Sequence, residues 1–385
     1  MRKRSSSPRK SSVAAADLIV VARSARQLAS AACAAGLRPV AIDLFGDDDT
    51  RACAERTVVL EAAPDLRFPP AALQAALAGI QAEFGALPLV WGSGFEGDAG
   101  LLRALEATFD VLGSPAAARV AIADPETFAT TLAALGIEHP PIARERPDDS
   151  GRWLSKQQGA AGGAHVREAA PGTRPVAGRY FQRHVAGRSL SAAFVATRDG
   201  ATLLGCSEHL RPQPEDAAPF RYGGAVGGVV LDGTSEVQLA AAIHGMCRAF
   251  GLVGLCGIDF ILDDAGRLVF LEVNPRPTAT FDLLTEPGAA LRAHLAACRG
   301  LPCPPLPVPP EVRGHAVLYA EHPIRIPKDI DWPPWVSDRP RAGTPIPTGA
   351  PVCSLAARGT EARTVRHLLL ERFTSLHRTM HAFKA

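Results

Sequence analysis

Two carboxylates and an amide are closely spaced in a segment that is typical of a β-hairpin. Asp259 lies in the apolar run 257–262, and a polar turn leads to a second apolar run that ends in Glu272. Asp259 can lie beside Glu272 across the two strands, and Asn274 follows on the same side of an extended chain. Such oxygen ligands suit Mg²⁺, which proteins usually hold with one or two carboxylates and substrate phosphates. Arg276 offers a guanidinium fork to a phosphate or carboxylate.

The alternative is a surface hairpin whose acidic side chains are only solvated. Both strands are largely apolar, and an acid inside an apolar strand needs a partner because an unpaired buried charge is costly. We therefore expect a metal ion to be that partner.

A lysine followed by glycines forms a second group with chemical potential. Lys156 ends a short expected strand, and Gly159, Gly162 and Gly163 follow. Glycine lets backbone N–H groups approach oxygen atoms closely, and lysine adds a point charge, so the segment is typical of a phosphate clamp. It is not a Walker A loop, because no Gly-Lys-Ser/Thr follows. A flexible hairpin with an exposed lysine is the alternative.

The composition indicates an ordinary globular protein. The chain has 385 residues, of which 47% are hydrophobic and 21% charged, enough for two or three domains. A net charge of +2 argues against a dedicated nucleic-acid surface. The basic, Ser-rich start predicts a disordered tail over residues 1–14.

Nothing in the sequence predicts a membrane span or a disulfide framework. No run reaches the roughly eighteen apolar residues that a span needs, so we expect a soluble, cytoplasmic protein. The eight cysteines form no Cys-x-x-Cys pair and are expected to be reduced, without a zinc site.

Strand, helix and strand alternate at the beginning of the chain. Residues 18–21 and 40–43 are expected strands around a helix at 26–35, which predicts a parallel sheet without a dinucleotide fingerprint. A further strand at 88–91 leads into the glycine-rich turn 92–97. This turn is either a substrate loop or a plain tight turn.

Later segments predict a more antiparallel arrangement. We expect a strand pair turning at Gly187 and an antiparallel meander through 192–195 and 202–206. Helices are expected at 125–135, 235–250 and 364–381. A proline-dense linker at 301–310 precedes an expected strand at 315–320.

In this order the segments resemble the ATP-grasp superfamily of ATP-dependent carboxylate ligases, in the group related to biotin carboxylase. The most specific motif is Glu-Val-Asn-Pro-Arg at 272–276 together with Asp259, supported by the Lys156 loop, 180–191 and 220–224. The resemblance implies a mixed α/β and α+β fold. A Rossmann-like α/β domain at 15–120 would precede an ATP-grasp domain at 121–300 and a small C-terminal extension at 301–385 that packs on the ATP-grasp core.

The resemblance also implies ATP and Mg²⁺ as cofactors and gives roles to single residues. Lys156 would hold the ATP phosphates under a lid containing Gly159, Gly162 and Gly163, and Arg276 would stabilise charge on the transferred phosphoryl group. Gln182, with Arg183, His184 and Val185, would form the adenine slot. The Mg²⁺ site would be formed by Asp259, Glu272 and Asn274.

Two positions depart from the family pattern. Many members have an Asp-Lys pair near the start of the ATP-binding domain, where this chain has Asp124-Pro125. One nucleotide-contacting lysine is therefore missing or replaced. Asp259 stands where many relatives use glutamate.

The implied activity is a ligase that converts a carboxylate to an acyl phosphate and joins it to an amine. Amino acids or cofactor precursors are the expected substrates, with tyramine–glutamate-type ligation in one-carbon cofactor synthesis as a special case. The alternatives are a carboxyphosphate-forming enzyme like biotin carboxylase and a non-catalytic ATP-binding regulator. Expected partners are the small-molecule carboxylate and amine, with no nucleic acid and no membrane, and a homodimer is the candidate assembly. Glu96, Glu208 and Arg221 are candidates for holding substrates.

Overall fold

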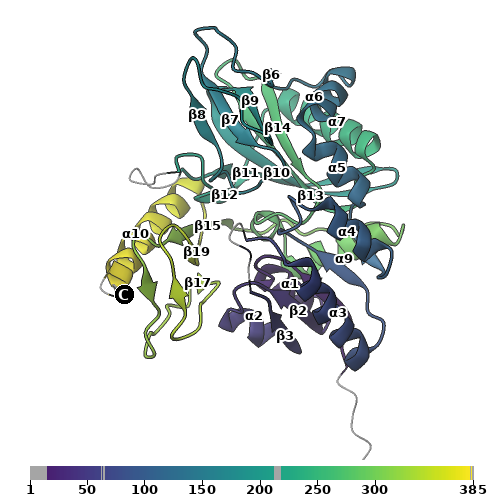
Figure 1. The fold of residues 1–385 in the computed structure, drawn as a ribbon, viewed down its shortest axis with the longest axis vertical. Helices are drawn as coiled ribbons and strands as arrows, with labels where there is room; N and C mark the ends of the chain where they lie inside the picture. The colour runs from purple at the N-terminus through teal and green to yellow at the C-terminus, as the bar shows by residue number, and fades with distance from the viewer. Residues whose placement is uncertain (1–14, 62, 64–65, 212–217, 382, 384–385) are drawn as a thin grey trace, which may run out of the picture.

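The computed structural model describes residues 15–61, 63, 66–211, 218–381 and 383, so the tail expected at residues 1–14 lies outside the described residues. One large antiparallel sheet occupies the centre of the molecule (Figure 1). A parallel sheet lies below it in this view, a small antiparallel sheet lies above it, and the C-terminal helix lies to its left.

The N-terminal part is a five-stranded parallel sheet of order β3-β2-β1-β4-β5, which confirms the predicted strand–helix–strand start. Its central strands are fully buried because four-residue apolar runs form them. The strands are β1 (Leu18–Val21), β2 (Pro39–Asp43), β3 (Arg56–Val59), β4 (Leu89–Trp91) and β5 (Val111–Leu112), and the helices are α1 (Arg26–Ala34), α2 (Asp48–Cys53), α3 (Pro70–Phe84) and α4 (Ala99–Glu106).

Two short helices connect this part to the small sheet. They are α5 (Ala116–Ala123) and α6 (Pro125–Ala134). Asp124 caps α6 by accepting a hydrogen bond from the Thr127 N–H at 2.8 Å, and Pro125 takes the first helical position. The small sheet has the order β6-β9-β7-β8, with β6 (Ile142–Ala143), β7 (Trp153–Gln157), β8 (Arg167–Ala169) and β9 (Arg179–Arg183).

The large sheet has eight strands in the order β14-β13-β10-β11-β12-β15-β19-β17. Its strands are β10 (Arg188–Thr197), β11 (Gly200–His209), β12 (Gly224–Val229), β13 (Gly254–Leu262), β14 (Leu268–Asn274), β15 (Val312–Tyr319), β17 (Val336–Ser337) and β19 (Pro351–Gly359). β16 (Ile324–Arg325) and β18 (Pro345–Ile346) form a separate pair.

Alternating residues of β10 contribute to two different cores, as a strand covered on both faces requires. Leu190 and Phe194 pack with α7 (Gly233–Phe250). Ala193 and Val195 pack with α9 (Pro287–Cys298), which follows the short α8 (Phe281–Leu284), and α9 also contacts α1. The helix α9 therefore joins the large sheet to the N-terminal part.

A glycine-dense segment forms a central strand of this sheet, which the sequence did not predict. A Cβ atom at Gly224 would lie 2.2 Å from the His315 carbonyl oxygen, so β12 approaches β15 too closely for a side chain. β15 pairs with β12 and with β19, so the large sheet continues into the last 85 residues. The C-terminal helix α10 (Ala362–His381) covers β15 and β19.

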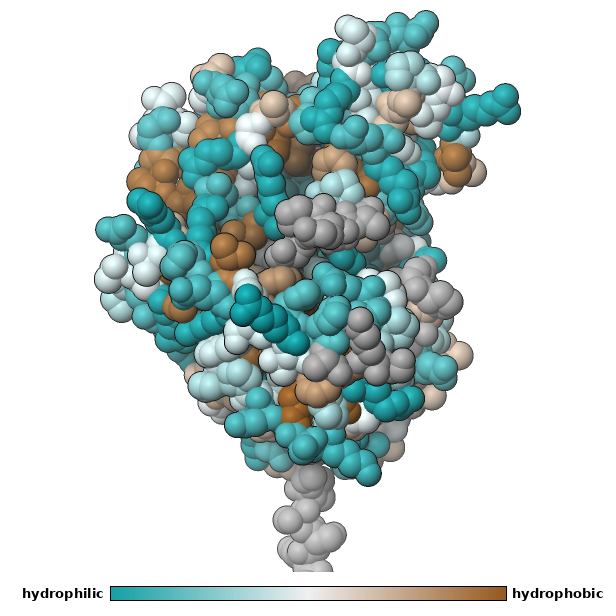
Figure 2. All heavy atoms as spheres, turned by 90° about the vertical axis from the view of Figure 1, so that its left-hand side faces the viewer, coloured by the Kyte–Doolittle hydropathy of each residue, from teal (hydrophilic) through white to brown (hydrophobic). Residues whose placement is uncertain are grey.

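Hydrophilic side chains cover most of the face shown in Figure 2, and hydrophobic ones form small groups between them. None of the helices in the described part of the chain has the length and apolarity to cross a membrane. All eight cysteines are free.

Candidate active site

The parallel sheet, the small sheet and the large sheet together enclose a cleft of about 1560 Å³. Almost every residue predicted to bind nucleotide or metal lines this cleft. They are Lys156, Gly162, Gly163, Gln182, Arg183, His184, Val185, Asp259, Glu272, Asn274 and Arg276. Gly159 lines a neighbouring cavity of about 70 Å³, whose wall also includes Lys156, Glu272, Asn274 and Arg276.

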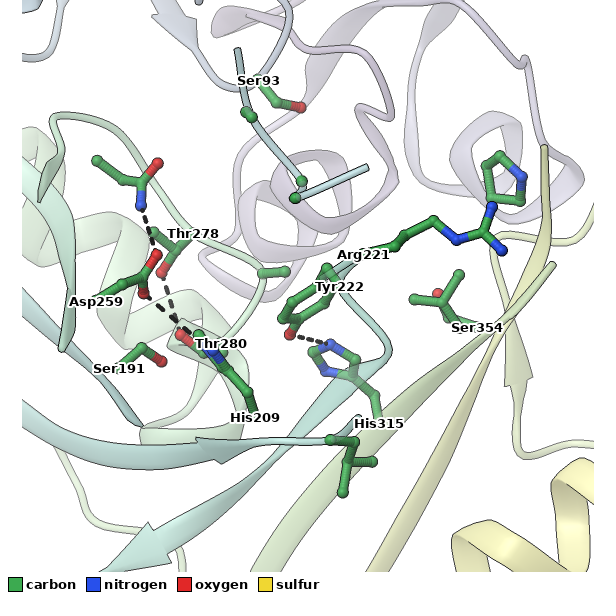
Figure 3. Close-up of a pocket in the computed structure, with 18 of the residues that line it drawn as sticks. Ser93, Ser191, His209, Arg221, Tyr222, Asp259, Thr278, Thr280, His315 and Ser354 are labelled. Carbon is green, nitrogen blue, oxygen red and sulfur yellow. Dashed lines mark hydrogen bonds and ion pairs between the residues drawn. The ribbon is translucent and has the colours of Figure 1, made fainter. Parts of the chain in front are cut away.

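The hairpin of β13 and β14 brings the expected metal ligands together. Asp259 is in register with Glu272, and Gly257 is in register with Asn274. A β-bulge follows Asp259, and the Asn274 side-chain N–H donates to Asp259 Oδ2 at 3.3 Å. All three oxygen-bearing side chains therefore line the same cleft, in which Figure 3 shows Asp259.

The two carboxylates of this hairpin interact with each other. Burial and the neighbouring Glu272 raise the pKa of Asp259 well above its ordinary value. Burial acts against ionisation of Glu272 as well, but Lys156 and the hydrogen bond shared with Asp259 lower its pKa overall. Since two adjacent carboxylates repel each other when both are ionised, a divalent cation is the natural partner for the pair, and these residues fit Mg²⁺.

Lys156 is buried, with only 8% of its surface exposed, so the alternative of an exposed lysine is wrong. Its Nζ donates to Gln182 Oε1 at 3.2 Å from the adjacent strand β9. Burial lowers the pKa of Lys156, but Tyr180 and Glu272 outweigh this effect and raise it overall. The ammonium group is therefore charged and held in place at the cleft wall.

The glycines after Lys156 pack against backbone on both sides. The Gly162 carbonyl oxygen accepts a hydrogen bond from the Tyr222 N–H at 3.0 Å. A Cβ atom at Gly163 would lie 1.8 Å from the Phe220 carbonyl oxygen, and one at Gly159 would lie 2.8 Å from that of Glu96. All three glycines have positive φ angles, between 67° and 78°. All three positions therefore favour glycine for their conformation, and Gly159 and Gly163 also require it for their close packing.

The expected adenine segment connects the small sheet to the large one. Gln182 is 2% exposed, and its backbone pairs with both β6 and β7. The N–H groups of Arg183 and His184 already donate to the carbonyl oxygens of Pro141 and Arg152, each at 2.9 Å. An adenine ring would have to meet this segment through other backbone groups.

Arg276 is tied to the N-terminal part of the molecule. Its Nη2 lies 2.8 Å from Glu96 Oε1, and Arg23 Nη2 lies 3.7 Å from the other carboxylate oxygen. Burial raises the pKa of Glu96, but Arg276 and Arg23 outweigh it and lower the pKa overall. The glycine-rich turn 92–97 thus positions Arg276 instead of serving only as a tight turn.

The other two substrate candidates are also held by protein groups. Glu208 lies 2.6 Å from Arg188 Nη2 and 2.8 Å from Arg366 Nη2. The Arg221 guanidinium lies 3.7 Å from the centre of the Tyr319 ring and donates to the Gly349 carbonyl oxygen at 2.7 Å.

Two residues near the hairpin were missed by the sequence reasoning. Arg119 on α5 is buried, donates to the Glu96 carbonyl oxygen and lines the small cavity beside Glu272. His209 Nε2 lies 3.8 Å from Asp259 Oδ1, and burial lowers its pKa to about 4. No motif marks either position, because only the fold brings them to the hairpin.

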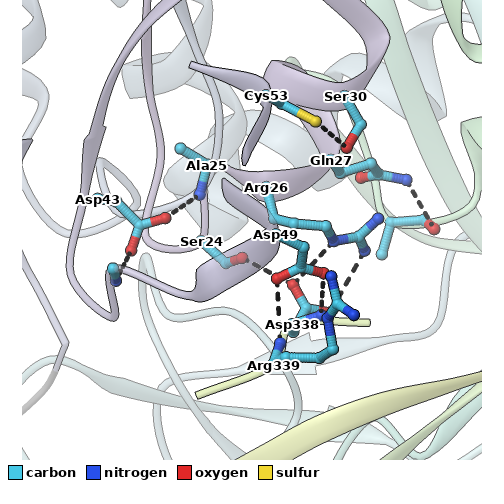
Figure 4. Close-up of polar contacts among 12 residues, drawn as sticks. Ser24, Ala25, Arg26, Gln27, Ser30, Asp43, Asp49, Cys53, Asp338 and Arg339 are labelled. Atoms are coloured by element: carbon cyan, nitrogen blue, oxygen red, sulfur yellow. Dashed lines mark hydrogen bonds and ion pairs between the residues drawn. The ribbon is translucent and has the colours of Figure 1, made fainter. Parts of the chain in front are cut away.

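The other end of the cleft lies where the parallel sheet meets the C-terminal strands (Figure 4). Asp338 accepts hydrogen bonds from Ser24 Oγ and Arg26 Nε, each at 3.0 Å. Asp49 accepts from the N–H groups of Asp338 and Arg339 at 2.8 and 3.1 Å. These acids are therefore well satisfied.

Asp47 is the exception in this acidic end of the cleft. It is 4% exposed and lines the cleft, but no described residue forms a hydrogen bond or ion pair with its carboxylate. Burial and the carboxylates of Asp338 and Asp43 raise its pKa to about 8. Its position after the carboxyl end of β2 is a sequence signal that could have identified it, because ligands gather at such ends.

Asp282 contributes a second acid to this end, and its buried Oδ1 has no hydrogen-bond partner among the described residues. Tyr222 and His315, which also line the cleft, face each other with their Oη and Nε2 atoms 2.7 Å apart (Figure 3). The cleft therefore has one end at the hairpin, lined by Lys156 and Arg276 as well, and a second end lined by acids.

Comparison with known proteins identifies one domain of this chain. Residues 122–280 match the model of the ATP-grasp domain. The chain therefore contains an ATP-grasp domain over these residues, which confirms the resemblance and the fold class drawn from the sequence. A search of curated proteins found no match.

Several solved structures share the fold at low identity. Biotin carboxylase from Campylobacter jejuni, solved with an ATP analogue, has a TM-score of 0.70 at 12% identity, covering 92% of this chain and 90% of that one. A second match is the biotin carboxylase domain dimer of 2-oxoglutarate carboxylase from Hydrogenobacter thermophilus, solved with MgADP and bicarbonate. Its TM-score is 0.69 at 11% identity, and the match covers 94% of this chain and 89% of that one. L-amino acid ligase from Bacillus licheniformis has a TM-score of 0.67 at 13% identity, and the match covers 92% of this chain and 96% of that one.

Proposed function

We propose that this protein is an ATP- and Mg²⁺-dependent ligase that joins a carboxylate to an amine. The observation that carries the proposal is the convergence of buried Lys156 with Asp259, Glu272 and Asn274 on one cleft. Of the solved structures named above, two are nucleotide complexes and the third is an L-amino acid ligase, which supports the same class for this chain.

The residues of the hairpin end can position the phosphates of ATP. Asp259, Glu272 and Asn274 would hold Mg²⁺, which would supply charge neutralisation, and Lys156 would bind a phosphate oxygen. Arg276, oriented by Glu96, would face the transferred phosphoryl group. We propose that Arg119 takes the place of the missing lysine, since its charge also lies in the small cavity beside Glu272.

The reaction needs no covalent bond to the protein. A carboxylate oxygen attacks the γ-phosphorus, and the bond from that phosphorus to the oxygen of ADP breaks. The amine nitrogen then attacks the acyl carbon and loses a proton, and the carbon–oxygen bond to phosphate breaks. Positioning and charge stabilisation supply most of the acceleration in such transfers.

The acidic end of the cleft supports an amine as the second substrate. Among the described residues, Asp47 is buried without a partner and Asp282 has an unsatisfied oxygen, so both would be stabilised by a bound ammonium group. Amino acids and precursors of cofactors, including those of one-carbon metabolism, are therefore the first substrates to test. A homodimer is the assembly that we propose, to be tested by light scattering.

The decisive experiment measures ADP and phosphate release from ATP and Mg²⁺ with pooled acids and amines. Release that requires one acid and one amine together supports the ligase. Release that requires bicarbonate instead of an organic acid identifies the carboxyphosphate-forming alternative. Tight ATP binding without turnover in any pool identifies a regulatory module and contradicts the proposal.

A further inference from the structure

A cluster of histidines and a glutamate lies outside the cleft, at the C-terminal end of the described chain. Glu321 and His322 follow β15, and His381 ends α10. The ligand atoms of these three residues all lie within 4.8 Å of one another. None of the three lines the cleft. The cluster therefore has no role in the reaction proposed above.

The surroundings of His322 leave one of its ring nitrogens available to a ligand. Its Nε2 atom is buried and has no hydrogen-bond partner among the described residues. The His322 and His381 rings meet edge to face, with centroids 5.1 Å apart. A buried ring nitrogen without a partner costs free energy, which a bound cation would recover.

A fourth residue orients the glutamate. His377 lies one helical turn before His381 on the same face of α10, and its Nε2 is 3.0 Å from Glu321 Oε1. Carboxylates that bind a metal are commonly held in this way by a second hydrogen-bonding group. His377 is thus suited to positioning Glu321.

We propose that Glu321, His322 and His381 bind a Zn²⁺ ion that ties the end of α10 to the segment after β15. Two imidazoles and one carboxylate are ligands that zinc accepts, with water completing four-coordination, whereas Mg²⁺ and Ca²⁺ prefer oxygen alone. The ion joins two elements that already pack together, since α10 covers β15. Its role is therefore structural.

The test titrates chelator-treated full-length protein with ZnCl₂ by calorimetry. Excess Mg²⁺ is present to occupy the hairpin of β13 and β14. We expect one Zn²⁺ per chain and a rise in melting temperature on binding. His322→Ala, His381→Ala and Glu321→Gln should each weaken binding by about 10-fold or more.

His367→Ala is the matched control. His367 lies on the same helix and pairs with Glu371 at 3.2 Å, but it is 74% exposed and is not part of the cluster. Its loss should leave Zn²⁺ affinity unchanged. Glu321→Gln preserves side-chain shape, so it keeps the test decisive if a histidine variant fails to fold.

Cobalt distinguishes this site from the free cysteines. Bound Co²⁺ should show the visible absorption of a tetrahedral site without a thiolate-to-cobalt charge-transfer band. Such a band, Zn²⁺ affinity that persists in a His322→Ala/His381→Ala variant, or the absence of stoichiometric binding would each overturn the proposal.

Discussion

The two ends of the cleft are built in different ways. At the hairpin end, Asp259, Glu272 and Asn274 lie on two consecutive strands, and their contacts follow from the register of one pair. At the acidic end, Asp47 and Asp282 come from the parallel sheet and from α8, and residues of β19 complete the wall. The proposed metal ligands are thus brought together by one hairpin, whereas the acidic end depends on how distant segments meet.

The largest effect is expected at the hairpin end. Glu272→Ala should reduce turnover on the order of 10³-fold or more, because the Mg²⁺ site loses a carboxylate and Asp259 loses its partner. Substrate-dependent ADP release measures the loss, and circular dichroism checks the fold.

Asp264→Ala is the control for this substitution, because Asp264 is an exposed acid in the turn of the same hairpin. It should leave activity within about twofold of wild type. Near-normal turnover of the Glu272 variant would remove the metal role assigned to the hairpin.

The next effect concerns the buried lysine. Lys156→Met keeps the length of the side chain but removes the charge near the phosphates, so kcat/KM for ATP should fall about 10²- to 10³-fold. Lys328→Met, at an exposed lysine, should have no effect on that ratio. Equal behaviour of the two variants would contradict a phosphate contact by Lys156.

A smaller effect is expected at the acidic end. Asp47→Asn should raise the KM for the amine about 10- to 100-fold, because a charged hydrogen bond is lost, while the KM for ATP stays constant. Asp48→Asn, one residue away and exposed, is the control. A change in the KM for ATP of the same size would show that the two ends do not divide the substrates as proposed.

The smallest expected effect is on stability, and it depends on pH. The pKa of Asp47 is about 8 in the folded state, above its ordinary value. The folded state therefore holds its proton over a range in which the unfolded state has lost it, and stability falls as the pH rises from about 4 to 8.

Asp47→Asn removes the titrating carboxyl group and with it this pH dependence of the folding stability. The variant should be more stable than the wild type at pH 8, by on the order of a few kcal/mol or less, and the difference should shrink towards pH 4. Urea unfolding at several pH values measures it. A variant that is less stable than wild type at pH 8 would show that the Asp47 carboxylate has a partner in the free protein.

Glycine shows how far local sequence can be misleading. The loop after Lys156 was expected to be glycine-rich for phosphate binding, and in the structure Gly163 is also needed because the Phe220 backbone lies against it. The segment at 224–229 is glycine-dense, a composition that disfavours strands. It is nevertheless a central strand, because only glycine allows β12 to approach β15 so closely.

The sequence by itself determined the parallel start of the chain, the hairpin at 254–274 and the pairing of Asp259 with Glu272, because hydrophobic periodicity and strand register act over a few residues. Tertiary structure alone decided the burial of Lys156, the contact of Arg276 with Glu96 and the isolation of Asp47. Each of these depends on segments that are far apart in the chain, and their meeting is fixed by the packing of whole elements, such as α9 between the large sheet and α1.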